Sequence, residues 1–421
     1  MIQRVRGTRD FQPDEMGRRR QLEDILRKIS RDYGYREIQT PTLENAELFT
    51  IKSGPGVLEE MYSFEDKGGR KIALRPELTA PIIRFYINDL SNYPIPLKLY
   101  CISNCFRYEE PQSGRYREFY QYDVEIIGSD APDADAELLL LANDLCRRLG
   151  LNDVRFRIGH VGIVRSMLDG TPVKKEEQSA FLRLVDKKRM DDASEFLKSR
   201  DVPSKTAGRI MEVCNTKGDR SVLHSIEGEA AAYLGEVLRI AETDGAMNLT
   251  VDLGVVRGLD YYTGIVFEID APELGAEKQI CGGGSYSLSQ LFGGKAVPST
   301  GMAFGFDRLM LAMERGGKAA GRENTDVFVL AASESQRESM IRIAGSLRRR
   351  GVSAEFDLMR RSMSKSLKYA SSRGARYAVM VGDREAASGK VLIRNMENGV
   401  QEEIGLERVA EELEKRLGNA R

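Results

Sequence analysis

The sequence predicts an α+β protein that is built on antiparallel strands and ends in a separate α/β domain. Three observations predict this fold class. Strand-like arms flank a polar turn within 97–127, charged helical segments fill 161–245, and strands alternate with helices after residue 325. A chain of 421 residues has room for two or three such domains.

Composition indicates a folded protein in a reducing compartment. The chain is 41% hydrophobic and 30% charged, and with a net charge of −1 the composition alone gives no hint of a nucleic-acid partner. It has no apolar run of about 18 residues, and the opening MIQRVRGTRDFQPDEM lacks the apolar core of a signal peptide. Five cysteines form no disulfide framework, and Cys101 and Cys105 lack further metal ligands nearby. We therefore expect a cytoplasmic protein with reduced thiols and no metal site from protein ligand motifs.

Histidine is nearly absent, which argues against histidine-dependent catalysis. His160 follows a predicted strand, and His224 lies in a polar helical region. A Ser-His or Cys-His nucleophile is therefore poorly supplied. An enzyme with this sequence would work through Arg, Glu, Gln and Tyr side chains, or through groups of its substrate.

The first elements follow from apolar periodicity and turn residues. A helical period predicts a helix over 18–33, which Gly34 ends. The elements expected next are a strand (35–43), a hairpin (58–64 with 71–74) and a buried helix (81–90).

A long antiparallel hairpin carries the strongest local signal. LKLYCISNCFRY at 97–108 and the arm 116–127 flank EEPQSG, whose Pro and Gly favour a turn. Arg107, Arg115 and Arg117 gather at the hairpin mouth, where guanidinium groups suit a polyphosphate. Carboxylates deeper in the sheet suit an ammonium or a protonated ring. The alternative is a solvated strand with cross-strand ion pairs.

The middle of the chain combines a helical insertion with further strands. A strong helix over 133–149 is followed by the charged helices of 161–245, which interrupt a sheet that resumes at 249–253. VDLGVVRGLDYYTGIVFEID at 251–270 is expected to form a second hairpin. Glycines 282–284 allow close backbone approach, or form a flexible loop. GMAFGFDRLMLAM at 301–313 is a strand that enters a helix.

The last part of the chain follows a Gly-rich charged linker at 314–324. The alternating strands and helices beyond it predict an α/β domain. Between Arg342 and Arg376 there are ten Lys or Arg residues against two acidic ones. Such a patch suits a nucleic-acid backbone, and the alternative is a solvated face.

These segments together resemble class II aminoacyl-tRNA synthetases, and most specifically histidyl-tRNA synthetases. FRYEEPQSGRYREFYQ at 106–121 is similar to motif 2 of the class, and MAFGFDRLMLAM at 302–313 to motif 3. RGLDYYTGIVFE at 257–268 resembles a histidyl-specific signature. The segment around Pro41 fits motif 1, which builds the dimer interface in the family. The C-terminal domain resembles the family's anticodon-binding domain.

The resemblance implies a domain organisation. It places an antiparallel class II catalytic domain in 1–160 and 246–318, with a helical insertion domain at 161–245. A linker at 319–325 then leads to an α/β anticodon-binding domain at 326–421.

The resemblance also implies an activity. The family activates L-histidine with ATP to histidyl-adenylate and pyrophosphate, with Mg²⁺ on the β- and γ-phosphates, and then transfers histidine to the 3′ end of tRNA(His). A homodimer is expected. Because a carboxylate attacks the α-phosphate, such an enzyme needs charge stabilisation and alignment, and no histidine base.

Site residues are carried over on the matching positions. By resemblance, Arg107 holds the α-phosphate, Arg308 holds the distal phosphates, and Arg257 is a fixed cation near the α-phosphate; these three are the catalytic candidates. The implied ATP site comprises Arg107, Glu109, Arg115, Phe119 and Arg308. The implied histidine site comprises Glu77, Thr79, Arg107, Gln121, Glu125, Arg257, Tyr261 and Tyr262. Candidate tRNA contacts from the basic patch are Arg348, Arg349, Arg360, Arg361 and Lys365.

The assigned roles have structural alternatives. Glu125 and Tyr262 would bind the imidazole nitrogens, and such a site rejects apolar amino acids because its own polar groups would stay unpaired. Glu125 could instead be a strand carboxylate paired to an arginine. The tyrosines 261 and 262 could pack in a strand, with one of them facing the core. Arg257 could form a structural ion pair with Asp260 or Glu268.

One segment departs from the family pattern. The family usually carries a Gly-Gly-Arg-Tyr-Asp-type sequence where this chain has CGGGSYSLSQLFGG. Tyr286 is present, but Ser285 and Ser287 replace the Arg and the Asp. Contacts at this end of the pocket therefore cannot be copied from the family.

Three other functions compete with this interpretation. The regulatory subunit of ATP phosphoribosyltransferase resembles the synthetase catalytic domain, but it generally lacks a basic C-terminal domain. A class II synthetase for glycine, threonine or proline is disfavoured by RGLDYY and Glu125. A nucleic-acid-binding protein without catalysis leaves the arginines of the three motifs unexplained.

Overall fold

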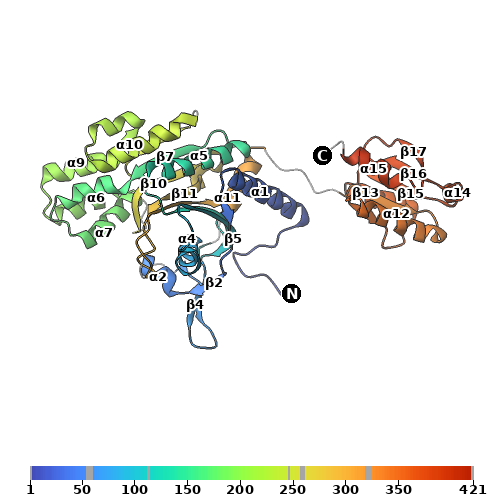
Figure 1. The fold of residues 1–421 in the computed structure, drawn as a ribbon, viewed down its shortest axis with the longest axis horizontal. Coiled ribbons are helices and arrows are strands. Elements are labelled where there is room, and N and C mark those ends of the chain that lie inside the picture. Colours follow the sequence, from blue (N-terminus) through green and yellow to red (C-terminus); the bar gives the residue numbers. More distant parts are fainter. Residues whose placement is uncertain are drawn as a thin grey trace. The chain divides into compact units, whose positions relative to one another are not determined.

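The computed structural model describes residues 2–53, 60–110, 114–244, 247–256, 261–317 and 325–418. The chain divides into two compact units, Met1–Ala320 and Gly321–Arg421, which are described separately (Figure 1). Among the helices that the structure describes, none has the length and apolar character needed to cross a bilayer.

A nine-stranded sheet forms the centre of the first unit. The strands in spatial order are β1 (Arg36–Glu37), β5 (Leu97–Phe106), β6 (Glu118–Ile127), β12 (Ser299–Gly305), β11 (Gln279–Tyr286), β10 (Tyr262–Asp270), β7 (Arg155–His160), β9 (Leu249–Asp252) and β8 (Lys217–Gly218). All pairings from β5 to β7 are antiparallel, whereas β1 on β5 and β9 on β7 are parallel. The antiparallel catalytic sheet expected from the sequence is therefore confirmed.

Strand alternation gives the sheet two buried faces. Tyr122, Val124 and Ile126 of β6 belong to one hydrophobic core, so Gln121 and Glu125 face the other side. The helices on the first face are α1 (Pro13–Asp32), α5 (Pro132–Arg148), α10 (Glu229–Ala241) and α11 (Phe306–Arg315). Figure 1 shows α1, α5 and α10 above the sheet and α4 (Thr79–Phe85) below it. A π-helical turn, Tyr86–Leu90, extends α4 where one continuous helix was expected.

The insertion consists of amphipathic helices. They are α6 (Val161–Asp169), α7 (Lys175–Asp186), α8 (Met190–Lys198) and α9 (Ser204–Asn215), followed by the 3₁₀ turns Arg220–Ser225 and Glu242–Asp244 on either side of α10. Their apolar residues, such as Phe181, Val185 and Leu197, are buried and join the core of the α4 face. The short strand β8 within this segment was not expected, and it extends the large sheet by pairing with β9.

Two predictions about strands are wrong. Residues 35–43 form two strands rather than one, because β1 pairs with β5 while β2 (Leu43–Asn45) joins a small separate sheet. The expected hairpin at 251–270 does not form, since β7 lies between β9 and β10. The turn residues 257–260 lie outside the described residues. Pairing with β7, a strand about a hundred residues earlier in the chain, replaces the local pairing.

A small three-stranded sheet carries the other N-terminal hairpin. β3 (Ser63–Glu65) and β4 (Lys71–Leu74) pair as expected, and β2 pairs with β4. The helix α2 (Glu47–Ser53) follows β2. Residues 58 and 59, part of the expected first strand, lie outside the described residues.

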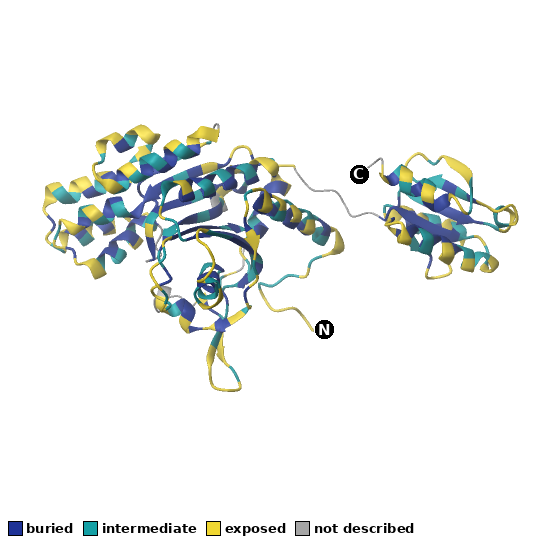
Figure 2. Cartoon of the chain, in the orientation of Figure 1, coloured by how far each residue is buried: buried dark blue, intermediate teal, exposed yellow. Residues whose placement is uncertain are grey.

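The second unit has the expected α/β organisation. Its strands in spatial order are β14 (Ala354–Phe356), β13 (Val327–Ala331), β15 (Tyr377–Val381), β16 (Lys390–Asn395) and β17 (Gln401–Gly405). The first three are parallel, and β16 and β17 form an antiparallel hairpin. Its helices are α12 (Arg337–Arg349), α13 (Met363–Ser372), α15 (Val409–Gly418) and the unexpected short α14 (Asp383–Ala387). The central strands β13 and β15 are buried, as Figure 2 shows, whereas the edge strand β17 is largely exposed.

Candidate active site

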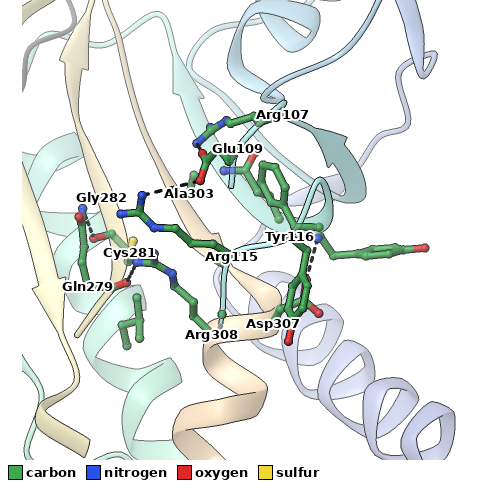
Figure 3. A pocket seen from close by; sticks show the side chains of 16 residues that line it. Arg107, Glu109, Arg115, Tyr116, Gln279, Cys281, Gly282, Ala303, Asp307 and Arg308 are labelled. Atoms are coloured by element: carbon green, nitrogen blue, oxygen red, sulfur yellow. Dashed lines mark hydrogen bonds and ion pairs between the residues drawn. The ribbon is translucent and has the colours of Figure 1, made fainter. Parts of the chain in front are cut away.

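A polar cavity of about 300 Å³ opens where the β5–β6 hairpin, β11 and α11 meet. Figure 3 shows Arg107, Glu109 and Arg115 on the hairpin side and Arg308 on the helix side. These side chains come from segments about 200 residues apart in sequence, so the antiparallel sheet order brings them together.

Arg107 lies just beyond the end of β5 and is held in place by three contacts. Its backbone N–H donates to Arg117 O at 3.0 Å, which continues the hairpin pairing. Its Nε donates to Pro76 O at 2.9 Å. Its guanidinium carbon lies 5.1 Å from the centroid of the Phe119 ring, within cation–π range. The side chain is therefore oriented before any ligand arrives.

Glu109 is a carboxylate set between two arginines. Its Oε1 lies 3.8 Å from Arg107 Nη1, and its Oε2 lies 3.7 Å from Arg115 Nη1. These separations exceed hydrogen-bond distance, so the attraction is electrostatic. Glu109 thus provides a hydrogen-bond acceptor at an otherwise cationic wall.

Arg308 projects from the first turn of α11. Its Nη1 donates to the backbone carbonyl of Gln279 at 2.5 Å, which ties the side chain to the start of β11. Figure 3 shows Arg115 between Glu109 and Arg308. Three guanidinium groups from two elements therefore surround the cavity, an arrangement that binds a polyanion such as a polyphosphate.

Asp307 positions the elements around the cavity. Its Oδ1 lies 2.6 Å from both Arg9 Nη2 and Arg19 Nη1, and its Oδ2 accepts the backbone N–H of Tyr120 at 3.0 Å. The carboxylate therefore joins the N-terminal segment, α1 and β6 to the start of α11. Because two arginines offset its charge, Asp307 leaves the cavity cationic.

Arg117, which the sequence grouped with the hairpin-mouth arginines, has a structural role. It is buried, its Nε donates to Glu109 O at 3.2 Å, and its guanidinium carbon lies 4.0 Å from the Tyr108 ring centroid. Arg107 and Arg115 line the cavity, whereas Arg117 lies against Tyr108 and supports the hairpin.

A second polar group is buried deeper on the same face of the sheet. Glu125 is 1% exposed, and its Oε2 accepts the Tyr286 hydroxyl at 2.6 Å. Burial and the Glu125 charge raise the pKa of Tyr286 well above its usual range, so the phenol stays protonated and donates. Gly301 pairs with Glu125 across β6 and β12, and a Cβ there would lie 1.7 Å from Glu125 Oε2. The carboxylate can occupy this place because residue 301 has no side chain.

Gln121 lies between the cavity and Glu125 on β6. It lines the cavity, and its Oε1 accepts the Cys105 thiol at 3.1 Å. Burial raises the pKa of Cys105 well above its usual range, so the thiol keeps its proton. With Oε1 occupied in this way, the amide NH₂ of Gln121 is oriented as a donor.

The tyrosines 261 and 262 do not face opposite sides, which corrects the sequence expectation. Both are buried, and their ring centroids lie 4.6 Å apart. Tyr261 also contacts Tyr286 edge to face at 5.9 Å. Strand alternation does not apply because Tyr261 precedes β10, which begins at Tyr262. The aromatic rings therefore lie together beside the Glu125–Tyr286 pair.

Glu77 acts at the beginning of α4. Its carboxylate accepts the backbone N–H groups of Thr79 at 2.9 Å and Ala80 at 3.1 Å. These are donors that a helix start otherwise leaves without partners. The carboxylate is thereby oriented by the helix, and Thr79 is fixed next to it.

The structure brings six of the twelve expected ATP- and histidine-site residues to one cavity. Arg107, Glu109, Arg115, Phe119, Gln121 and Arg308 all line one cavity. Arg257 lies outside the described residues. Glu268, one of the two partners considered in the structural alternative for Arg257, forms an ion pair with Arg157 at 2.5 Å.

Sequence reasoning missed Asp307, Cys281 and Gln279. Asp307 had a usable signal, since an acidic residue in the first turn of a helix is a common anchor. Cys281 had none beyond its place next to the glycine run. The backbone carbonyl of Gln279 accepts a hydrogen bond from Arg308. Because any residue type supplies a backbone carbonyl, the sequence carries no signal for this contact.

The five basic residues of the second unit differ in their surroundings. Arg349, Arg360 and Lys365 are exposed. Arg361 pairs with Asp357 at 2.6 Å and stacks on Tyr369 at 4.2 Å. Arg348 donates to Ala354 O at 2.9 Å. Arg349, Lys365 and Arg360, whose Nη1 lies 3.4 Å from the exposed Glu334 carboxylate, therefore have the accessible charge that a phosphate backbone needs.

The described residues offer few side-chain ligands for a metal ion. Across the ranges that the structure describes, no group of three or more His, Cys, Asp or Glu side chains could hold an ion.

Comparisons with known proteins relate the whole chain to one family. The family model described as histidyl-tRNA synthetase matches residues 7–309, and an anticodon-binding domain model matches 326–416. A histidine–tRNA ligase from Archaeoglobus fulgidus is 46% identical over 404 residues, which cover 95% of this chain and 96% of that protein.

Solved structures agree with this relationship. The crystal structure of apo S. aureus histidyl-tRNA synthetase matches with a TM-score of 0.76 at 28% identity, covering 98% of this chain and all of that chain. A Bacillus halodurans structure, titled an ATP phosphoribosyltransferase regulatory subunit/histidyl-tRNA synthetase, matches with a TM-score of 0.78 at 26% identity over 91% of this chain and 98% of that chain.

Proposed function

The chain belongs to the histidyl-tRNA synthetase family, and we propose that it activates L-histidine with ATP in this cavity and transfers it to tRNA(His). One observation carries the proposal. Three arginines converge on a cavity that lies on the same sheet as the buried Glu125–Tyr286 pair. A cationic cavity and a buried carboxylate acceptor suit the two substrates of this reaction, a triphosphate and a cationic or neutral imidazole.

Each part of ATP can be assigned to residues that line the cavity. We place the α-phosphate at Arg107, whose guanidinium is already oriented by Pro76 and Phe119. Arg115 and Arg308 would bind the β- and γ-phosphates, since they lie on the opposite side of Glu109 from Arg107. The Phe119 ring offers a stacking face for adenine, and Glu109 offers an acceptor for its amino group.

Mg²⁺ belongs to this proposal as a companion of ATP. The described residues hold no cluster that could bind an ion alone, so the phosphates would supply most of its ligands. When bound, Mg²⁺ offsets charge on the β- and γ-phosphates. The arginines of this chain orient the triphosphate for attack.

Histidine fits the deeper part of the site. Glu125 would accept the imidazole N–H, with Tyr262 and Tyr261 beside the ring. Gln121, Glu77 and Thr79 would surround the α-ammonium and carboxylate end, near the α-phosphate at Arg107. The substrate carboxylate then attacks the α-phosphate, pyrophosphate leaves, and the arginines stabilise the charge that develops. Arg257 remains our candidate for a further cation at this point.

The regulatory-subunit alternative is not favoured. The Bacillus halodurans title names both activities, so likeness of fold does not separate them. The anticodon-binding match over 326–416 and the ligase relative aligned over 95% of the chain do separate them. Both findings favour an aminoacylating enzyme.

A pyrophosphate exchange assay tests the activity. With purified protein, Mg²⁺ and ATP, labelled pyrophosphate should enter ATP when histidine is added, and should not when any of the other amino acids replaces it. The specificity follows from Glu125, which an apolar side chain would leave without a hydrogen-bond partner. Exchange supported by another amino acid, or no exchange with histidine, would contradict the proposal.

We further propose that the exposed basic residues of the second unit bind tRNA. Neutralising all three in an Arg349→Gln, Arg360→Gln, Lys365→Gln variant should raise the KM for tRNA by about tenfold or more and flatten its salt dependence. Histidine-dependent pyrophosphate exchange should stay unchanged, because these residues lie in the other compact unit. A Lys390→Gln variant, in β16, is the matched control. An unchanged KM and salt slope would rule out this surface.

Assembly and location complete the proposal. We propose a homodimer, because the segment around Pro41 is similar to the motif that builds the family's dimer interface. We also propose a cytoplasmic location, where tRNA and ATP are available. All five cysteines lie within the described residues, are buried and form no disulfide, which suits a reducing compartment.

A further inference from the structure

A second cavity, of about 350 Å³, lies on the α5 side of the large sheet. The start of α5, the end of β7, α10 and the strands β10, β11 and β12 supply its walls. Ser285 lines it and is the neighbour of Tyr286, whose hydroxyl binds Glu125. The ATP and histidine sites proposed above make no use of this cavity.

Asp135 is a buried carboxylate in this cavity, and it has no cationic partner among the residues that the structure describes. It is 1% exposed, and its oxygens accept the Ser285 hydroxyl at 2.9 and 3.0 Å and the Tyr233 hydroxyl at 2.8 Å. Both partners are neutral, and burial raises the pKa of the Asp135 carboxyl. No Lys or Arg occurs among the described residues that line the cavity, which include a second carboxylate, Asp130.

His160 adds a hydrogen-bond donor to the same cavity. It is 8% exposed, and its Nδ1 accepts the backbone N–H of Gly162 at 3.0 Å. The ring proton is therefore on Nε2, and burial lowers the pKa of His160 to about 4, which keeps the ring neutral. His160 as a whole is more than nine-tenths buried and lines the cavity, so its Nε2–H is a donor that an occupant of the cavity could meet.

These groups define the chemistry of an occupant. A desolvated carboxylate with neutral partners favours a cation, and an N–H that lines the cavity favours an acceptor. We propose that this cavity binds a small molecule that carries a guanidinium or ammonium group at Asp135 and a hydrogen-bond acceptor at His160. The occupant would lie behind the Glu125–Tyr286 pair, across the thickness of the sheet. The proposal is independent of the enzymatic function, since it uses none of the residues assigned to it.

A substitution at Ser285 can place a longer side chain in the cavity beside Asp135. The Ser285 side chain points at Asp135, so a longer basic side chain there would place its charge where we expect the occupant. The related family segment carries Arg at this position, and the serine of this chain leaves the space open. Ser285→Arg should therefore compete with an added cation, and Ser285→Met should fill the space without supplying charge.

Two probes of the same shape test the proposal. Methylguanidinium and N-methylurea differ in charge, and binding of each to the full chain can be measured by ligand-observed NMR titration. Methylguanidinium should bind at least about tenfold more tightly than N-methylurea, because only the cation pairs with the buried carboxylate. Asp135→Asn and Ser285→Arg should each abolish the difference.

Thermal stability gives a second test of the proposal, which does not depend on binding of a probe. Ser285→Arg should have a higher Tm than Ser285→Met, and the order should reverse when Asp135→Asn is added to both. Equal binding of the two probes to the natural chain would overturn the proposal. So would binding of methylguanidinium that Asp135→Asn and Ser285→Arg leave unchanged, since the cation would then lie elsewhere.

Discussion

An Arg107→Ala variant should lose about 10²–10³-fold in the kcat of histidine-dependent pyrophosphate exchange. The loss is large because Arg107 is oriented before ATP binds. Its Nε is held by Pro76 O at 2.9 Å and its guanidinium lies against Phe119, so its terminal N–H groups are directed without a cost in side-chain order. The KM for ATP should rise less than kcat falls, because the role we assign to Arg107 is strongest in the transition state.

Arg107→Lys separates the effect of the planar guanidinium from that of its charge, and Arg70→Ala is the control. Arg107→Lys keeps the charge but loses the planar pair of donors, so its activity should fall between those of the natural enzyme and Arg107→Ala. Arg70→Ala, at the exposed tip of the β3–β4 hairpin, removes a guanidinium paired with Asp66 and should leave exchange unchanged. A kcat for Arg107→Ala equal to that of Arg70→Ala would exclude Arg107 from the chemical step.

A Gly301→Ala variant should lose about 10²-fold or more in kcat/KM for histidine. The added methyl carbon would lie 1.7 Å from Glu125 Oε2, so the carboxylate must leave its place and Tyr286 loses its acceptor. We expect most of the loss in the KM for histidine, while ATP should still bind at the arginines. Initial rates of exchange over a range of histidine concentrations measure this directly.

The matched control for this change is another Gly→Ala substitution. Gly208 lies in α9, where an added Cβ meets nothing within 4 Å, so Gly208→Ala should keep full activity and gain slightly in stability. Tyr286→Phe removes the same hydrogen bond without adding an atom, and it should raise the KM for histidine in a normally folded protein. Full activity of both Gly301→Ala and Tyr286→Phe would contradict the assignment of Glu125 to histidine.

The β5–β6 hairpin shows how far local signals reach. Its alternating arms and the Pro and Gly of its turn predicted the pairing from Leu97 to Ile127 that the structure contains. The 251–270 segment has equally strong strand signals, yet its two strands are separated by β7. The length of the connection does not explain the difference, because residues 107–117 join β5 to β6 and residues 253–261 join β9 to β10. The distant strand β7 pairs with both β9 and β10, and this long-range pairing replaces the local one.

The same contrast holds at the candidate site. The motif arginines were identified before the structure, because Arg at a hairpin mouth and at a helix start has a recognisable local pattern. Asp307 was not, because its partners Arg9 and Arg19 lie 298 and 288 residues away in the chain. The dependence of Glu125 on a glycine at 301 was also hidden, since it is set by the register of β6 on β12.

The amino-acid sequence by itself determined the α+β class, the helical insertion, the C-terminal α/β domain and the residues expected to meet ATP and histidine. The fold features depend on periodicity and turn residues, which are local, and the site residues were assigned by resemblance to the family's sequence motifs. Tertiary structure alone decided the order of the strands, the anchoring of Asp307, the space for Glu125 and the cavity at Asp135. Each of these depends on backbone register and on contacts between distant residues, which no local pattern records.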